Sequence, residues 1–395
     1  MTNPDSAQMS AVRTLSGKQR MLNAYRGVWS DRAAVAPEFW YYYPARLLGV
    51  DMIEFEREVP FHLALKTTFE RFNCEGWGVA FPGVPNDQVE HHAEEHWTPD
   101  GRLLVRHTAK TSHGELTSAQ LYDREEPSWT VERPVKDVER DLPAYACMSL
   151  PDPTGLDPAQ LIQAWHEVGE TYLLEAWLGV PFFDFYAGGR EGGFEAAIFD
   201  LVDDQPQLEH LQAQYIEHIV LKARVVCERT PLESLCIGCS WSNNSLLGAA
   251  RWRRWDKPVL AAVAQEVHRH GRLLHVHFHG RCMETVADFA ELGLDCVCPF
   301  ERPPGGDVEG LDGLRAAARL LDGRTTFNGN VHTVETLIRG TEEDARREVR
   351  EIWNAFRHTP RVIIGTGDQV GRETPEENLH AMIDEAKRLT ARPQA

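Results

Sequence analysis

The stretch KPVLAAVAQEVHRHGRLLHVHFHGRCMETVADFAELGLDCVCPFE, residues 257–301, contains the pattern that decides the fold. Apolar residues recur at helical spacing over 257–271 and again over 283–293, and each of these segments is followed by a short apolar run, 273–280 and 294–301. Helices that alternate with apolar strands are typical of βα units, in which consecutive strands lie parallel. The stretch therefore predicts two such units in succession.

The same alternation extends from about residue 155 to the end of the chain. Together with a first strand near 33–38, about eight strands are expected, which favours a closed (β/α)8 TIM barrel over an open sheet. The strands outside the first stretch are expected at 33–38, 181–188, 234–241, 325–330 and 361–367. In such a barrel, catalytic residues lie where the strands end and the following loops begin.

Two further segments complete the predicted α/β architecture. The N-terminal segment SGKQRMLNAYRG predicts a helical extension that begins after a Ser16 cap. Residues 76–133 contain short strands separated by turn signals, and they predict an antiparallel β-meander inserted into the barrel. We therefore expect a single barrel domain over residues 1–395.

The composition restricts the classes of function. The chain has 395 residues, of which 42% are hydrophobic, and its 60 acidic against 41 basic residues give a formal charge of −19. This charge repels nucleic acids and anionic membranes, so small-molecule chemistry or a protein partner is expected. No apolar run is long enough to cross a membrane, and the first residues lack the pattern of a secretion signal. With eight cysteines expected to be reduced thiols, these features favour a cytoplasmic protein.

Two close cysteine pairs, Cys236 with Cys239 and Cys296 with Cys298, have two explanations. Together they could hold a zinc ion through four thiolates, or they could be small buried side chains. The strand-like sequence around both pairs favours burial, because successive residues of a strand point to opposite faces.

Three histidines alternate near the end of one predicted strand. His275, His277 and His279 are two residues apart, so the three imidazoles share a face and point into the barrel towards its catalytic end. Buried imidazoles are unfavourable unless they are hydrogen-bonded or bind a metal, and both explanations stand. We predict His277 and His279 as metal ligands and His275, the deepest, as a supporting catalytic residue.

Carboxylates follow other predicted strands. Asp368 comes just after the strand over 361–367, and opposite a histidine cluster it becomes the natural third ligand; it could also be a turn residue. Glu301 ends the strand over 294–301 and could be a metal ligand, a general base or the partner of an arginine. Asp184 also lies in a predicted strand, and solvation in a loop is the competing explanation.

Substrate contacts are expected from two further groups. Asn330 and His332 end the strand over 325–330 and could bond to a substrate. Trp40 and Tyr42, in an aromatic run after the first strand, could wall a flat apolar or aromatic pocket, or pack between barrel and insertion. The sequence lacks GxGxxG after a strand, GxxxxGK[ST], GxSxG and HExxH, so nucleotide-binding, serine-hydrolase and zincin functions have no support.

Several longer segments carry a further signal. They are YRGVWSDRAAVAPEFW (25–40), PVKD (134–137), HFHG with the later ELGLDCVCPFE (277–301), FNGNVHTVETLIRGTEEDARREVREI (327–352) and GTGDQVGRETPEENLHAMIDEAKR (365–388). In this order they resemble the uroporphyrinogen decarboxylase superfamily, and specifically its methyltransferase branch. The resemblance runs from about residue 20 to residue 390 and so covers nearly the whole chain. It implies a (β/α)8 barrel.

In that branch, zinc is held through a His-x-Cys-Gly motif and a later cysteine after the last strand. The matching positions here are His277, His279 and Asp368, so an imidazole and a carboxylate replace two thiolates. Such a ligand set makes Zn²⁺ a stronger Lewis acid that can polarise an ether oxygen, and it could equally hold Fe²⁺. The resemblance thus implies an O-demethylase-like enzyme that passes the methyl group to cobalamin on a partner protein.

We therefore hypothesise a metal-dependent methyltransferase that demethylates a small methoxylated or methylated compound. Its expected partners are this substrate and a corrinoid carrier protein, since the chain lacks the corrinoid-binding motif DxHxxG, and a homodimer stays open. A decarboxylase or lyase that uses the same residues for acid–base chemistry is the second hypothesis, and a binding barrel without catalysis is the third. The decarboxylase is disfavoured because the arginine-rich N-terminal motif of that branch is absent and the charge of −19 opposes a polyanionic substrate.

Overall fold

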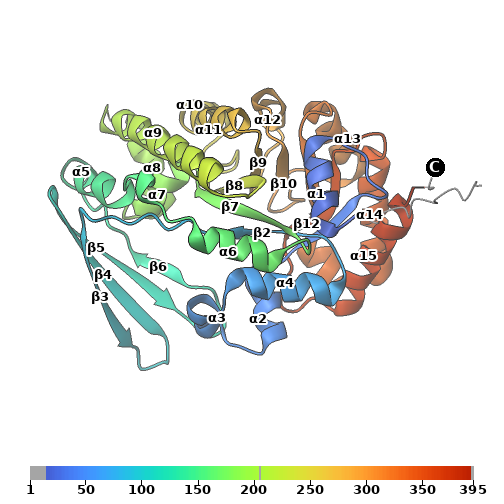
Figure 1. Ribbon diagram of the computed structural model, residues 1–395, viewed down its shortest axis with the longest axis horizontal. Helices are drawn as coiled ribbons and strands as arrows, with labels where there is room; N and C mark the ends of the chain where they lie inside the picture. The colour runs from blue at the N-terminus through green and yellow to red at the C-terminus, as the bar shows by residue number, and fades with distance from the viewer. Residues whose placement is uncertain (1–14, 204–205, 393–395) are drawn as a thin grey trace, which may run out of the picture.

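The barrel is one curled parallel sheet. The computed structural model describes residues 15–203 and 206–392. Its largest sheet has eight strands in the order β1-β12-β11-β10-β9-β8-β7-β2, and helices cover its outer face, which confirms the predicted (β/α)8 barrel (Figure 1). The barrel strands are β1 (Ala34–Glu38), β2 (Trp77–Ala80), β7 (Leu173–Gly179), β8 (Ser234–Cys239), β9 (Leu273–Phe278), β10 (Cys296–Pro299), β11 (Thr326–Val331) and β12 (Val362–Gln369).

Amphipathic helices connect the strands and pack their apolar faces on the sheet. They are α1 (Gly17–Arg26), α2 (Tyr42–Leu48), α3 (Met52–Glu58), α4 (Phe61–Phe72), α5 (Val138–Ser149), α6 (Ala159–Val168), α7 (Phe182–Gly189), α8 (Gly193–Val202), α9 (Pro206–Arg229), α10 (Ala249–Trp255), α11 (Lys257–Arg269), α12 (Val286–Leu292), α13 (Gly310–Leu321), α14 (Glu342–Phe356) and α15 (Glu376–Thr390). A 3-10 turn at Pro153–Gly155 and a π-helix at Thr333–Ile338 precede α6 and α14. Ser16 caps α1 as predicted, through a capping box. Over residues 15–203 and 206–392, no helix is long and apolar enough to cross a membrane.

The interior of the barrel is filled by side chains of the strands and of α1. This helix covers the end at which the strands begin, where Thr326 of β11 donates to the carbonyl of Ala24, and it buries Met21 and Tyr25 completely. Their neighbours in the interior are Ala34, Ala36, Trp77, Val79, Cys236, Cys296, Cys298 and Ile363. The opposite end, where the strands finish, is the end at which barrel enzymes carry their active sites.

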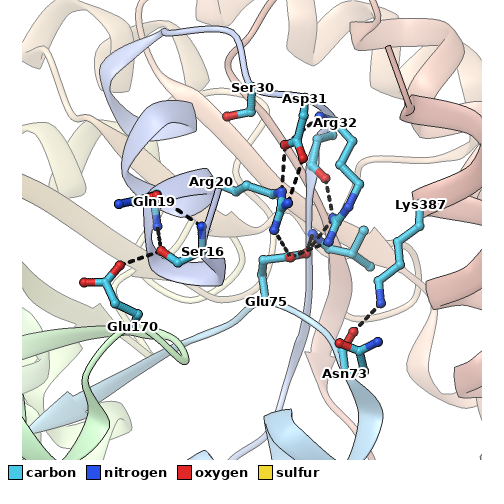
Figure 2. A network of polar contacts seen from close by, with 12 residues as sticks. Ser16, Gln19, Arg20, Ser30, Asp31, Arg32, Asn73, Glu75, Glu170 and Lys387 are labelled. Atoms are coloured by element: carbon cyan, nitrogen blue, oxygen red, sulfur yellow. Dashed lines mark hydrogen bonds and ion pairs between the residues drawn. The ribbon is translucent and has the colours of Figure 1, made fainter. Parts of the chain in front are cut away.

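Side chains, rather than a backbone ladder, join the first two strands of the barrel (Figure 2). Within the described residues, β1 pairs with β12 and β2 pairs with β7, but β1 and β2 form no ladder. The buried carboxylate of Glu75, just before β2, accepts hydrogen bonds from Arg20 of α1, from Arg32 and from the backbone N–H of Val35. Asp31 binds the Arg20 guanidinium through two further hydrogen bonds. One carboxylate thus ties α1, β1 and β2 together.

Two predicted segments differ from the structure. The strand predicted at 181–188 is the helix α7, and the barrel strand of this region is β7, which follows α6 after a break at Gly169. The meander predicted over 76–133 begins too early, because Trp77–Ala80 pairs with β7 in the barrel. Both differences have one cause: periodicity alone cannot assign a short apolar run to a helix, a barrel strand or a hairpin.

The predicted antiparallel insertion is present in a shorter form. Its strands, in spatial order, are β3 (Glu90–Trp97), β4 (Leu103–Thr111), β5 (Gly114–Tyr122) and β6 (Trp129–Glu132). β3 is exposed along its whole length, whereas Leu103 and Val105 of β4 pack against Ile53 of α3. The insertion therefore stands beside the first helices of the barrel (Figure 1).

Candidate metal centre and active site

Strand β9 carries His275 and His277 into the barrel interior, and His279 follows directly after its end. His275 is fully buried, whereas 27% of the His279 side chain is exposed. Trp77 of β2 packs edge-on against His275 with ring centroids 4.6 Å apart, and the Trp40 ring lies 6.3 Å from that of His277. The three imidazoles thus form a column from the middle of the barrel to its catalytic end.

A chain of hydrogen bonds determines which nitrogen of His277 is free. Glu175 of β7 binds Nδ1 of His275 at 2.8 Å, so Nε2 of a neutral His275 is an acceptor. Cys298 of β10 lies 3.0 Å from that Nε2 and 3.0 Å from Nδ1 of His277. The thiol therefore donates its proton to His275 and accepts the Nδ1–H of His277. In this arrangement Nε2 of His277 carries a lone pair.

The second free nitrogen belongs to His279. Its Nδ1 lies 2.6 Å from Oε1 of Glu301, which also accepts the backbone N–H of Gly280, so this carboxylate orients the ring. The remaining Nε2 lies 2.7 Å from Nε2 of His277. Because two lone pairs repel each other, this contact requires a proton or a cation between the nitrogens. A metal ion can take the place of the shared proton, and the carboxylate on Nδ1 of His279 is a partner expected for a metal-binding histidine, whereas the partner on Nδ1 of His277 is the Cys298 thiol.

Burial and the surrounding charges shift the pKa values of the two rings in opposite directions. Burial, followed by the positive charge of His279, holds the pKa of His277 well below its usual range. Burial alone would also lower the pKa of His279, but its hydrogen bond with Glu301 and the negative charge of nearby carboxylates, Asp368 first, outweigh this and raise it to about 9. The metal-free pair thus holds one proton, mainly on His279.

Glu38, the last residue of β1, is the acid beside His277. Its Oε1 accepts the indole N–H of Trp40 at 2.6 Å and lies 3.7 Å from Nε2 of His277, whereas its buried Oε2 has no hydrogen-bond partner among the described residues. Burial, followed by the negative charge of Asp368, raises the pKa of Glu38 to about 8. A carboxyl group in this state keeps its proton at neutral pH and can act as an acid.

Asp368, in β12, lies at the edge of this cluster. Its Oδ1 accepts the N–H of Gln369, and burial raises its pKa against the opposing positive charge of His279. Two compact groups of candidate metal ligands occur in the described residues: Glu38–His277–Cys298 and Glu175–Cys236–His275. The predicted set of His277, His279 and Asp368 is not one of them, so the structure brings the two histidines together without drawing Asp368 into contact with both.

Most of the other predicted residues support the backbone around the site. Asn330, buried in β11, donates to two carbonyl groups, and His332 accepts two backbone N–H groups at the start of the π-helix. Asp184 lies in α7 and accepts three backbone N–H groups from the loop after β8. Tyr42 donates to a carboxylate of the insertion. Trp40 is the predicted substrate residue that contacts the cluster, through Glu38.

The four paired cysteines form no shared thiolate site in the part of the chain that the structure describes. Cys236, Cys296 and Cys298 line the barrel interior, but Cys239 belongs to the core between strands and helices. Burial raises the pKa of all four thiols well above the usual range, so they are neutral. All four thiols are buried, as the second explanation expects, and Cys236 and Cys298 each belong to one of the two candidate ligand groups.

Sequence reasoning missed Glu38 and Glu175, and it singled out Cys298 without its contacts to the histidines. Glu38 ends the first strand, and its place before the aromatic run was the signal that could have identified it. Glu175 was hidden because β7 continues the helical pattern of α6. Cys296 and Cys298 are two residues apart on β10, as the histidines are on β9. Only the pairing of these two strands, which places Cys298 opposite His277, shows that the thiol and the imidazoles meet.

Replacing Glu38 with glutamine should change how the stability of the metal-free protein depends on pH. The pKa of this carboxyl group is about 8 in the folded chain against about 4.5 in its ordinary state. Between these values the folded state binds more protons, so the free energy of unfolding falls as the pH rises, by at most about 1.4 kcal/mol per pH unit. Urea titrations after chelation should show this slope in wild-type and in control Glu54→Gln protein, and a shallower slope in Glu38→Gln. Equal slopes in all three proteins would contradict the raised pKa.

A (β/α)8 barrel with ionisable residues gathered at the ends of its strands is typical of barrel enzymes. The chain belongs to the uroporphyrinogen decarboxylase (URO-D) family, whose profile matches residues 184–389, slightly more than half of the chain. A methyltransferase from Methanosarcina mazei is similar in fold, with a TM-score of 0.66 and 14% identity over 95% of this chain and 99% of that chain. A GH5 xyloglucanase from Bacteroides ovatus matches with a TM-score of only 0.33 and 10% identity over 79% of this chain and 98% of that chain. No curated protein matches.

Proposed function

We propose that this chain is a metal-dependent methyltransferase that removes a methyl group from a small methoxylated or methylated compound and passes it to cobalamin on a separate carrier protein. The observation that carries the proposal is the pair of Nε2 atoms of His277 and His279, which lie 2.7 Å apart while both Nδ1 atoms are engaged. The likeness in fold to a methyltransferase over nearly the whole chain supports the class of reaction.

The residues of the site fit a divalent cation. His277 and His279 would hold it through Nε2, with Asp368 as the proposed carboxylate ligand. Glu38 lies beside them, and its buried Oε2 has no hydrogen-bond partner among the described residues. Imidazole and carboxylate ligands suit Zn²⁺, and they also suit Fe²⁺. Such an ion supplies the Lewis acidity that polarises an ether oxygen.

The chain's own residues have separate tasks in this proposal. Glu301 and Cys298 orient the two ligand rings through their Nδ1 atoms. Glu175 fixes the proton on Nδ1 of His275 and thereby the direction of the bonds through Cys298. In the metal-free chain, burial raises the pKa of Glu38 to about 8, and this carboxyl group is placed to supply a proton to the oxygen that loses its methyl group.

The test combines metal content with methyl transfer. Purified protein should contain about one zinc or iron per chain, since a catalytic site of this kind holds a single ion. With added cob(I)alamin and a panel of methyl ethers and methylated amines, at least one donor should methylate the cobalt, seen as a change in its absorbance spectrum, and chelation should stop the reaction. Chelated protein with undiminished activity would contradict the proposal, and so would a panel that yields only decarboxylation.

A further inference from the structure

A cavity lined partly by Trp40 opens where β1 and β2 end, at the catalytic end of the barrel. It has a volume of about 240 Å³. Its aromatic lining comes from the ends of β1 and β2, from α3 and α4 and from the insertion: Trp40, Tyr41, Phe55, Phe61, Phe81 and Tyr122. We call this cavity the aromatic pocket. It is smaller than the usual cavity for a drug-sized ligand and suits a compact group.

The rings of the aromatic pocket form a connected wall. Trp40 and Phe61 are stacked with centroids 5.4 Å apart, and Phe55 meets Phe61 edge-on at 6.3 Å. Tyr41 stands between them, 6.2 Å from Trp40 and 6.4 Å from Phe55. Phe81 is 58% exposed, which is unusual for a phenylalanine and places apolar surface where a ligand can cover it.

One carboxylate faces this wall. Glu56 of α3 lines the pocket and accepts hydrogen bonds from the backbone N–H and the hydroxyl of Ser128. Among the described residues, no lysine, arginine or histidine forms an ion pair with it; the neighbouring Arg57 pairs with Glu95 instead. Burial, followed by the negative charge of Glu56, raises the pKa of Tyr41, which shows that this charge is felt at the rings.

We infer that the aromatic pocket binds a methylated ammonium group. The faces of aromatic rings attract cations, and a quaternary ammonium gains most because it has no hydrogen-bonding protons to leave unsatisfied. Glu56 supplies the matching negative charge; the cation nearest to it in the chain, Arg57, lies over the ring of Tyr122 and pairs with Glu95 instead of Glu56. A neutral aryl ether would fill the rings but leave the carboxylate unmatched, and an anionic one would be repelled.

Because the aromatic pocket lies next to the proposed active site, we take the methylated ammonium group to be part of the substrate. Trp40 links the aromatic pocket to the histidine pair, since its ring lines the pocket and its indole N–H binds Glu38 beside His277. This assignment rests on the proposed function, because it identifies the compound bound in the aromatic pocket with the molecule that is demethylated. The binding itself requires neither metal nor corrinoid, so it can be tested alone.

Titration of the whole chain with choline, followed by calorimetry and by tryptophan fluorescence, tests the inference. Choline should bind with saturation, and its uncharged carbon analogue 3,3-dimethylbutan-1-ol should bind at least about tenfold more weakly, a difference of about 1.4 kcal/mol. Glu56→Gln should weaken choline binding by a similar factor, and Phe61→Leu should weaken it as well. Glu58→Gln, which removes the same charge from an exposed position on α3, should leave it unchanged.

The outcomes separate the two claims. Equal binding of choline and its uncharged analogue would overturn the ammonium pocket, as would choline binding that is insensitive to Glu56→Gln in a protein with an unchanged melting temperature. Absence of saturable choline binding would overturn it too, even if methyl transfer from an ether persists. Choline binding that follows the predicted pattern in a protein that transfers no methyl group would uphold the pocket and contradict the proposed function.

Discussion

Replacement of His277 by alanine should remove the bound metal and lower the rate of methyl transfer to cob(I)alamin at least about a hundredfold. Residues that merely orient a metal ligand change affinity or activity by 10- to 100-fold when they are lost, so the loss of a ligand should cost at least as much. The Nε2 of His277 is the nitrogen left free by the bond of Nδ1 to Cys298. Elemental analysis of dialysed protein and the absorbance assay with cob(I)alamin measure the two effects.

Two further variants serve as a control and as a case of intermediate effect for His277→Ala. His166→Ala removes an exposed imidazole from α6, which contributes no residue to the column of histidines. This variant should leave the metal content and the rate of methyl transfer unchanged. Cys298→Ala should fall between, because His277 keeps Nε2 but loses the acceptor that orients its ring. A His277→Ala protein that retains a full equivalent of metal would remove His277 from the ligand set.

Replacement of Glu75 by glutamine should lower the free energy of unfolding by about 3–5 kcal/mol. The substitution removes the carboxylate partner of the mostly buried Arg32, whereas Arg20 keeps its two hydrogen bonds to Asp31. It also weakens the acceptor for the backbone N–H of Val35 at the start of β1. An uncompensated buried charge is among the most costly single changes in a protein, and urea denaturation monitored by far-UV circular dichroism measures it.

The matched comparison is Glu95→Gln. Glu95 also pairs with an arginine, Arg57, but both side chains are substantially exposed, 50% and 34%. Exposed ion pairs contribute at most about 1 kcal/mol, so this variant should be nearly as stable as the wild type. Equal losses in the two variants would show that burial of Glu75 adds nothing to the stability of the barrel.

The barrel could be predicted from the sequence because its later units repeat one pattern. Strands such as β9 and β12 are flanked by helices of clear amphipathic spacing, and the glycine or proline between them marks each boundary. The pattern fails where an element is too short to show a period. β2 has four residues, and β7 follows α6 with little change in composition, so both were assigned to the wrong element.

The column of histidines was visible in the sequence, but its chemistry was not. Spacing shows that His277 and His279 share a face, yet the choice between Nδ1 and Nε2 depends on Cys298 and Glu301, which come from β10 and its following loop. Glu38 was missed for the same reason, since only the curled sheet brings the end of β1 close to His277 on β9, four strands away in the sheet. Residue types can be read along the chain; the pairing of their atoms needs the tertiary structure.

The strand pairing of β1 has a consequence for folding during synthesis of the chain. Ala34 and Val35 have their backbone partners at Ile363 and Ile364, near the far end of the chain, and β2 offers β1 no ladder. During synthesis on the ribosome, this first strand therefore has no strand to pair with until the final strand is made. Translation that stops before residue 362 would release a product with both borders of β1 open, which is the kind of exposed strand that aggregates or is degraded.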